Sequence, residues 1–296
     1  MPIQRVTQKM LTQQSIGSLQ TGLSKLARIQ EQMSTGKILN RPSDSPTDTT
    51  SAMRLRSSIA DVQQYSRNAS DGDAWLTQID SALTNANDQV GRARDLALQG
   101  ANSGSAGPTA REALAAEVDQ IRGGLIDTAN SSYLGRPVFG GVTSGAKAYD
   151  ASGTFVGTSG AVNRTVAAGT SIRVDVDGQQ VFGPTGSSLF DHLDALSTAL
   201  RAGDQAGISA SLTALEADKN RITTTQTDVG TRQIRVEAAI QSADDSTLKL
   251  KDQLSTVENV DLPKVIVDLQ MQQTAYQASL AATSKVMQPS LLDFLR

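Results

Sequence analysis

The sequence predicts a mainly α-helical protein: a long antiparallel helical bundle or coiled-coil rod formed by both chain halves, with a small β-rich inserted domain. Two long stretches without proline carry apolar residues at every seventh position, which is typical of a coiled-coil seam. Between them, glycine and β-branched residues become frequent and the helical period disappears. Aromatic residues make up only 3% of the 296 residues, which favours helices packed along narrow seams.

The first helix is expected at about residues 5 to 35. Apolar residues there follow a 4-3-7 spacing, at Leu19, Leu23, Leu26 and Met33. The seam is thin, because most of the remaining positions are polar and many are glutamine. Gly36 is a suitable C-terminal stop.

The second helix has a clear start, with Ser45 as the N-cap, Pro46 in the first helical position and Asp48 three residues after the cap. Its sevenfold ladder is apolar throughout and consists of Leu55, Val62, Ala69, Leu76, Leu83, Val90 and Ala97. A third helix is expected to begin with a capping box of Thr109 and Glu112 and to end near Asn130.

The segment from 134 to 187 is predicted to be the β-rich insertion. Ile172, Val174 and Val176 alternate with polar residues and precede the turn pair Asp177-Gly178, which predicts a hairpin at this point. Residues 154–156 and 162–166 are weaker strand candidates.

Helical pattern returns after the insertion. Ser188 and Asp191 are expected to cap a helix that stops at Gly203. The longest ladder follows, at Ile208, Leu215, Ile222, Val229, Val236, Ala243, Leu250 and Val257. Its polar companions, Lys219, Gln226 and Gln233, are predicted to contact neighbouring molecules.

The repeat slips near Pro263, and a last thin-seamed helix follows until Pro289. We therefore expect three parts: terminal coiled-coil segments, 1–44 with 261–296, disordered in the monomer; a helical rod, 45–133 with 188–260; and the insertion, 134–187. The terminal segments bury too little apolar area to offset their ordering entropy alone, so they should fold as subunits assemble. The expected assembly interface is Leu19, Leu23, Leu26, Met33, Leu269, Tyr276, Leu280 and Met287.

Composition argues against several classes of function. A net charge of −3 gives no electrostatic case for nucleic acid, and the absence of cysteine excludes disulfides. No apolar run is long enough for a membrane span, and the N-terminus has no apolar core of a secretory signal. The single histidine, His192, is expected on the exposed side of its helix in a structural or surface role. No catalytic, cofactor or metal site is predicted.

Four segments resemble the flagellin superfamily. MSTGKILNRPSDSP at 33–46 resembles the family's junction between terminal helix and rod, and LGRPVFGG at 134–141 the segment leading to the outer domain. The opening IQRVTQKML and the ending QQTAYQASLAATSKVMQPSLLDFLR are similar to members that connect the hook to the filament.

The resemblance implies a structural adaptor and not an enzyme. It implies contacts with the first hook-associated protein, with flagellin and with further copies of the chain in a ring, and a cytosolic export chaperone that holds the C-terminal segment. It also implies flagellar type III export to the cell exterior. A filament flagellin is the first alternative. An enzyme on a coiled-coil scaffold is the second, and it would need a convergent set of polar groups in a pocket.

Overall fold

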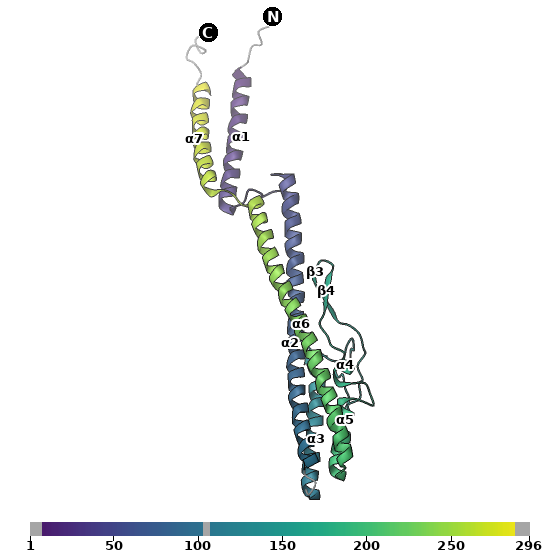
Figure 1. Cartoon of the computed structure of the whole chain (residues 1–296). Coiled ribbons are helices and arrows are strands. Elements are labelled where there is room, and N and C mark those ends of the chain that lie inside the picture. Colours follow the sequence, from purple (N-terminus) through teal and green to yellow (C-terminus); the bar gives the residue numbers. More distant parts are fainter. Residues whose placement is uncertain (1–7, 103–106, 288–296) are drawn as a thin grey trace, which may run out of the picture. The chain divides into compact units, whose positions relative to one another are not determined.

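A computed structural model describes residues 8–102 and 107–287 of the chain (Figure 1). The helices are α1 (Gln8–Thr35), α2 (Pro46–Asn102), α3 (Pro108–Ala129), α4 (Gly178–Phe182), α5 (Leu189–Ala202), α6 (Gln205–Glu258) and α7 (Leu262–Met287). The strands are β1 (Ser132–Tyr133), β2 (Arg136–Pro137), β3 (Asn163–Ala167) and β4 (Thr170–Arg173). The predicted fold class, mainly α-helical with a small β-rich insertion, is confirmed.

The chain divides into two compact units. Unit 1 consists of Met1–Ala60 with Leu248–Arg296, and unit 2 consists of Asp61–Thr247. In unit 1, α1 and α7 lie side by side (Figure 1). The start of α2 also belongs to this unit, and it is capped as predicted: the Asp48 backbone N–H donates to Ser45 Oγ at 3.3 Å. This bond satisfies one of the free N–H groups at the helix start.

The heptad ladders form the core of unit 2, where α2 and α6 run antiparallel. The buried ladder residues are Ala69, Leu76, Leu83, Val90 and Ala97 on α2, and Ile208, Leu215, Ile222, Val229, Val236 and Ala243 on α6. Each of these side chains is at most 7% exposed. A seven-residue period therefore identified the buried face of both helices correctly.

Polar side chains fix the register of α2 against α6. Gln226 Nε2 donates to Asp80 Oδ1 at 3.1 Å, and Gln233 Nε2 donates to Thr77 Oγ1 at 3.3 Å. Both glutamines therefore have a partner within their own subunit, and their expected contact with neighbouring molecules stays a prediction. A polar residue at a companion position of the heptad can bond across the seam of its own subunit, and periodicity alone does not reveal its partner.

The second pair of helices in unit 2 is α3 with α5. The capping box of Ser188 and Asp191 at the start of α5 is confirmed. The capping box predicted at Thr109 was wrong, because α3 begins at Pro108 with Gly107 as its N-cap and no side-chain cap. Proline is well suited to the first position of a helix, where no N–H partner is needed.

The insertion contains two short hairpins. The strand at 163–167 pairs with Thr170–Arg173 across a turn at Gly169, which confirms the weaker strand candidate. The hairpin predicted around Asp177-Gly178 was wrong: the Asp177 side chain accepts from the Gln179 N–H and caps α4. An aspartate before glycine serves equally well as a helix cap and in a turn, so the local signal was ambiguous.

Aromatic side chains fasten the insertion to α5. Tyr149 and Phe182 are buried and meet edge to face, with ring centroids 5.7 Å apart. Phe190, at the start of α5, lies 5.2 Å from the Tyr149 ring and 5.6 Å from the Phe182 ring. Aromatic side chains therefore form much of the core between the insertion and the start of α5.

Candidate assembly interface

Two extended segments of unit 1 hold the bases of α1 and α7 together. The Ile38 N–H donates to the Glu258 carbonyl oxygen at 2.7 Å, and the Val260 N–H donates to the Gly36 carbonyl oxygen at 3.0 Å. Lys37 and Asn259 form an antiparallel bridge between them. Gly36 adopts φ +68°, a conformation that favours glycine. We call residues 36–38 with 258–260 the terminal clamp.

Glu258 is the charged centre of the terminal clamp. Its side chain is 5% exposed and lies 2.6 Å from the Arg56 guanidinium and 3.1 Å from Lys37 Nζ. A carboxylate is stable at such burial only when it is paired, so the two cations account for its position. The three residues connect α2, α6 and the segment after α1.

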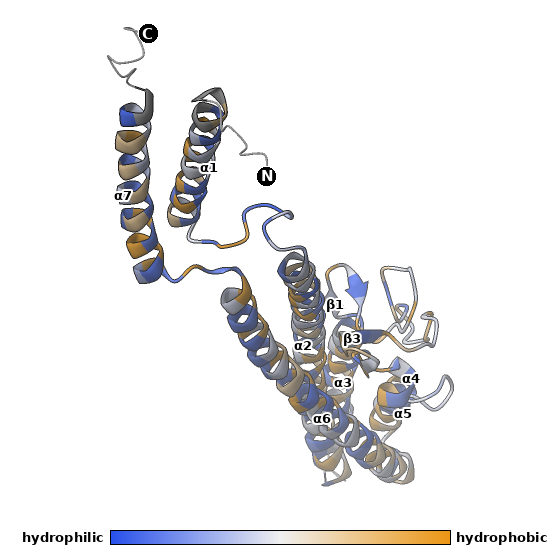
Figure 2. Ribbon diagram, turned by 90° about the horizontal axis from the view of Figure 1, so that it is seen from above, coloured by the Kyte–Doolittle hydropathy of each residue, from blue (hydrophilic) through white to orange (hydrophobic). Residues whose placement is uncertain are grey.

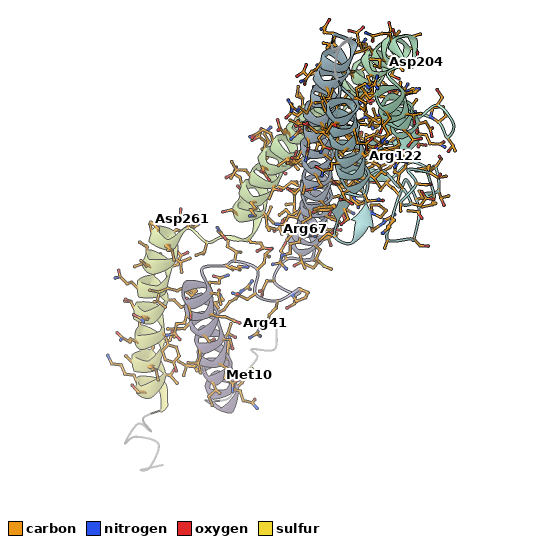
Figure 3. The ribbon with its side chains drawn as sticks, turned by 90° about the horizontal axis from the view of Figure 1, so that it is seen from below. Met10, Arg41, Arg67, Arg122, Asp204 and Asp261 are labelled. Carbon is orange, nitrogen blue, oxygen red and sulfur yellow. The ribbon has the colours of Figure 1, made fainter. Side chains whose placement is uncertain are left out.

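The loop after α1 is organised by Asp44. Its Oδ2 accepts from the backbone N–H groups of Arg41 at 2.9 Å and Asn40 at 3.1 Å, and its Oδ1 lies 3.2 Å from the Arg28 guanidinium. The hydrogen bond from the Arg41 N–H lowers the pKa of Asp44. Arg41 itself, labelled in Figure 3, lies 3.4 Å from Glu31.

Beyond the terminal clamp, α1 and α7 are in contact at Gly22. Gln272 Nε2 donates to the Gly22 carbonyl oxygen at 3.2 Å, and a Cβ on Gly22 would lie 3.3 Å from Tyr276 Cδ2. A trough of about 450 Å³ opens beside this contact. Its walls are mostly small or polar, and include Gln14, Gly17, Ser18, Thr21, Lys25, Ala275 and Ser279. The seam between the helices is therefore only partly filled.

The eight residues of the expected interface fall into three groups. Leu19, Leu26, Leu269 and Tyr276 are half-buried in the α1–α7 pair. Leu23, Met33 and Leu280 are exposed by 42% to 52%. The Met287 side chain lies outside the described residues.

Apolar side chains remain exposed on both helices. Figure 2 shows apolar residues spread along α1 and α7. The large exposed ones are Met10, Ile16, Leu23, Met33, Leu262, Ile266, Val267, Met271 and Leu280. Among the described residues of the two helices, Val265 is the one buried hydrophobic side chain. A helix pair with so small a core and so much uncovered apolar surface is suited to packing against further helices.

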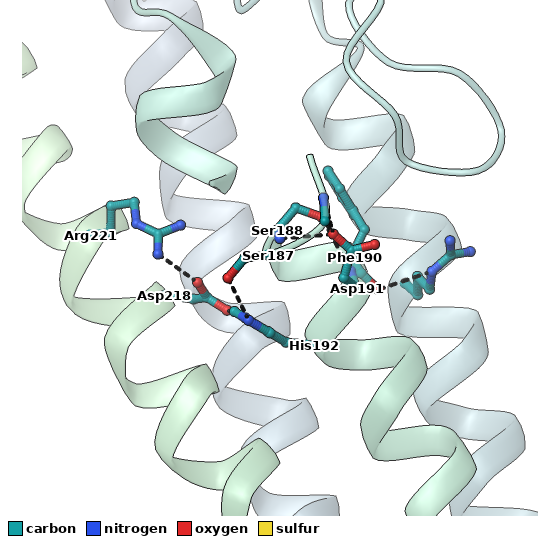
Figure 4. Close-up of polar contacts among 9 residues, drawn as sticks. Ser187, Ser188, Phe190, Asp191, His192, Asp218 and Arg221 are labelled. Atoms are coloured by element: carbon teal, nitrogen blue, oxygen red, sulfur yellow. Dashed lines mark hydrogen bonds and ion pairs between the residues drawn. The ribbon is translucent and has the colours of Figure 1, made fainter. Parts of the chain in front are cut away.

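His192 was predicted to lie on the exposed side of its helix, but it contacts Asp218 of α6 instead (Figure 4). Its Nδ1 lies 2.6 Å from Asp218 Oδ2, and its side chain is 22% exposed. Asp218 is fully buried and also lies 3.2 Å from the Arg221 guanidinium. Burial raises the pKa of Asp218. Ser187 Oγ is 3.5 Å from His192 Nε2, which is too long for a well-formed hydrogen bond.

The sequence analysis did not identify Glu258 or Asp218. Both lie on α6 close to ladder residues: Glu258 directly follows Val257, and Asp218 is three residues after Leu215. A carboxylate beside a heptad seam, with arginine or lysine available on the partner, is the signal that could have indicated them. Which cation meets it depends on long-range pairing.

Two further observations concern other classes of site. Among the described helices, none carries an apolar stretch long enough to cross a lipid bilayer. Within the same described residues, no three histidine, cysteine, aspartate or glutamate side chains gather in the way a metal centre requires.

Comparisons with known proteins match this architecture. Residues 5–144 match the profile of the bacterial flagellin N-terminal helical region, and residues 212–295 match that of the C-terminal helical region. Flagellar hook-associated protein 3 of Salmonella typhimurium is 26% identical over 317 residues, covering 99% of this chain and 100% of that protein. The Escherichia coli protein of the same name is 27% identical over 321 residues, covering 98% and 99%.

A solved structure shares the fold. It is that of a putative flagellar hook-associated protein from Vibrio parahaemolyticus, with a TM-score of 0.68 at 20% identity. The match covers 73% of this chain and 100% of that one.

Proposed function

Because the chain belongs to the flagellin family, we propose that it is the structural adaptor subunit that joins the hook of the bacterial flagellum to the flagellin filament. Similarity over nearly the full length of two proteins named flagellar hook-associated protein 3 supports this role. The role is mechanical and not catalytic: the chain acts by packing against other subunits.

The observation that carries the proposal is the uncovered apolar surface of α1 and α7. Val265 is buried, whereas Leu23, Met271 and Leu280 are 52%, 63% and 45% exposed. Covering such side chains contributes about 25 cal/mol for each Å² of apolar surface removed from water. Helices of neighbouring subunits would bury these side chains, and the terminal clamp would orient α1 and α7 toward those helices.

The interface consists of Leu19, Leu23, Leu26, Met33, Leu269, Tyr276, Leu280 and Met287. Tyr276 and the half-buried leucines hold α1 to α7, and the exposed members contact other subunits. The partly filled trough beside Gly22 leaves room for α1 and α7 to adjust their packing as subunits stack.

The partners are the first hook-associated protein on the hook side, flagellin on the filament side and further copies of this chain in a ring. A cytosolic chaperone holds the C-terminal segment before export. The chain travels through the flagellar type III channel, and it acts outside the cell.

Deletion of the gene tests the role. Cells should lose their filaments while flagellin accumulates in the medium, because the filament has nothing to attach to. Loss of the filament protein itself would instead identify the chain as a filament flagellin. Filaments that persist would contradict both structural roles.

A pair of substitutions tests the interface. Leu280→Asp changes an exposed side chain, so the free protein should keep its melting temperature while the deletion strain stays without filaments. Tyr276→Asp should act in the same way on assembly, and it should also weaken the α1–α7 contact. Gln277→Asp is the matched control, since it adds a carboxylate to α7 without removing an apolar group. Equal rescue by Leu280→Asp and Gln277→Asp would refute the interface.

A further inference from the structure

Leu134 is an exposed leucine at the tip of the β1–β2 hairpin. Its side chain is 80% exposed, and its backbone has φ +48°. Gly135, the second residue of the turn, has φ +77°, so both central residues are left-handed as in a type I′ turn. Asparagine, aspartate or glycine is usual at the first position, because a branched side chain is strained there. A strained residue whose side chain is largely exposed in its own subunit indicates a function elsewhere.

The turn that carries Leu134 is firmly held. Tyr133 and Arg136, the residues on either side of the turn, both contact the buried Trp75. The Tyr133 ring meets the Trp75 ring edge to face at 5.6 Å, and the Arg136 guanidinium lies 5.7 Å from its centroid. The leucine is therefore presented on a rigid base, which lowers the entropic cost of binding through it.

Unit 2 also carries an apolar pocket of about 210 Å³. It lies between α2, the tip of the β3–β4 hairpin and α6, and its apolar walls are Val62, Tyr65, Val166, Ala167, Ala239 and Ala243. At about 30 Å³ for each water molecule, its volume corresponds to roughly seven waters, which is enough for the four carbons of a leucine side chain.

We propose that Leu134 of one copy inserts into this pocket on the neighbouring copy in the ring. The inference rests on the proposed function, which requires contacts between copies. Charge supports the pairing: Arg136 follows the leucine by two residues, and Asp244 adjoins the pocket residue Ala243. Among the described side chains, neither Arg136 nor Asp244 is in an ion pair. Arg136 contacts the uncharged ring of Trp75, so its charge can still attract Asp244 across the contact.

A second copy is the occupant that fits best, because this chain supplies both halves of the contact. Leu134 and the residues that line the pocket are different parts of unit 2. One copy can therefore use its Leu134 on one neighbour and its pocket for another, and repetition of such a heterologous contact generates a ring when the rotation closes.

Cross-linking tests the contact directly, since the chain contains no cysteine. Two differently tagged variants, Leu134→Cys and Ser246→Cys, would be expressed together in the deletion strain, and the assembled flagella treated with a short thiol cross-linker. Ser246 lines the pocket. We expect a covalent dimer that carries both tags. Ile234→Cys replaces Ser246→Cys in the control, because Ile234 is 68% exposed on α6 and outside the pocket.

Three outcomes would overturn the proposal. They are equal cross-linking to Ile234→Cys, cross-linking of Leu134→Cys only to a different flagellar protein, and no dimer although filaments form normally.

Leu134→Asn separates this contact from folding. Asparagine tolerates a positive φ, so the melting temperature of the free protein should stay equal or rise, whereas filaments should detach at lower shear. A merely structural leucine would lower both together. If deletion of the gene abolishes filaments but Leu134→Asn restores them fully, this inference fails and the proposed function stands. If deletion leaves filaments intact, the proposed function fails.

A charge exchange gives an independent check. Arg136→Glu should weaken filament attachment, and Asp244→Arg in the same chain should restore it, because the pair is then reversed across the contact. Failure of the second substitution to restore attachment would count against the pairing of these two residues.

Discussion

Replacing Glu258 by glutamine should loosen the terminal clamp without changing its shape. The carboxylate is 5% exposed and lies 2.6 Å from the Arg56 guanidinium and 3.1 Å from Lys37 Nζ. Glutamine has the same length and can still accept one hydrogen bond, but it carries no charge. The backbone bonds of Ile38 and Val260 remain, so the change isolates the ion pairs.

The expected loss is about 1.4 kcal/mol. Hydrogen bonds to charged groups contribute about 1.5 to 3 kcal/mol each, against about 1 kcal/mol for a neutral one. Both cations are about half exposed, at 56% for Arg56 and 45% for Lys37, so solvent screens a large part of the gain. A loss of about 1.4 kcal/mol is a tenfold change in an opening equilibrium.

Native-state amide exchange of the free protein measures this opening. In Glu258→Gln, the amides of Ile38 and Val260 should exchange about tenfold faster, because their protection depends on a closed clamp. Glu31→Gln is the matched control: Glu31 meets Arg41 at 3.4 Å with both side chains exposed, and its loss should change exchange less than about twofold. Unchanged exchange in Glu258→Gln, or an equal change in both variants, would refute the reasoning.

Gly91→Ala should raise the free energy of unfolding by about 0.8 kcal/mol, because a Cβ there meets nothing within 4 Å. Gly100→Ala should lower it by about 1 kcal/mol, because its Cβ would overlap Leu200 Cδ2. Urea unfolding of both variants measures these changes, and a gain in both would contradict the close approach of Gly100 to Leu200. Burial raises the pKa of Asp218 above 3.8, so its contribution to stability is complete below pH 3.8 and is lost as the pH rises through the folded-state pKa. Compared with Asp218→Asn, the native chain should therefore lose unfolding free energy as the pH rises in urea titrations between about pH 3 and 7, and parallel curves would contradict this sign. In the free chain, the amides of α1 and α7 should exchange far faster than those of α3 and α5, with protection beginning at the terminal clamp; strong protection throughout α1 would show that the helix folds without assembly.

The helical ladders could be predicted from the sequence because their signal is local and repetitive. Leu76, Leu83 and Val90 are buried at the spacing that the sequence shows, and so are Ile222 and Val229. The seven-residue period states which face of a helix is buried, whatever its partner. The cap at Ser188 was predictable for the same reason, since it depends on residues three apart.

The predictions that were wrong concern partners rather than periods. The sequence did not reveal that Gln226 bonds to Asp80 of the same chain. His192 was assigned to an exposed face because Asp218, 26 residues later, was not known to approach it. Asp177 fitted both a turn and a helix cap, and only the pairing of the strand at 163–167 with Thr170–Arg173 decided between them.

The candidate interface was predictable only in outline. Leu19 and Tyr276 follow the thin heptads, and the structure places both in the α1–α7 pair. Leu134 was not predictable as a contact, because its exposure and its left-handed backbone result from the hairpin between Tyr133 and Arg136. Strain of this kind is a property of the backbone and does not follow from residue type.

The antiparallel register of α2 and α6 has a consequence for the order of folding. Asp80 and Gln226, which bond across it, are 146 residues apart in the chain. Closing a loop of that length costs about 4.4 kcal/mol of chain entropy by the logarithmic rule, before any contact in the seam compensates. A chain that leaves a narrow channel N-terminus first has α2 outside well before its partner arrives. The core between α2 and α6 cannot form in such a chain before α6 has left the channel. The emerged part therefore stays unfolded until most of the chain is outside.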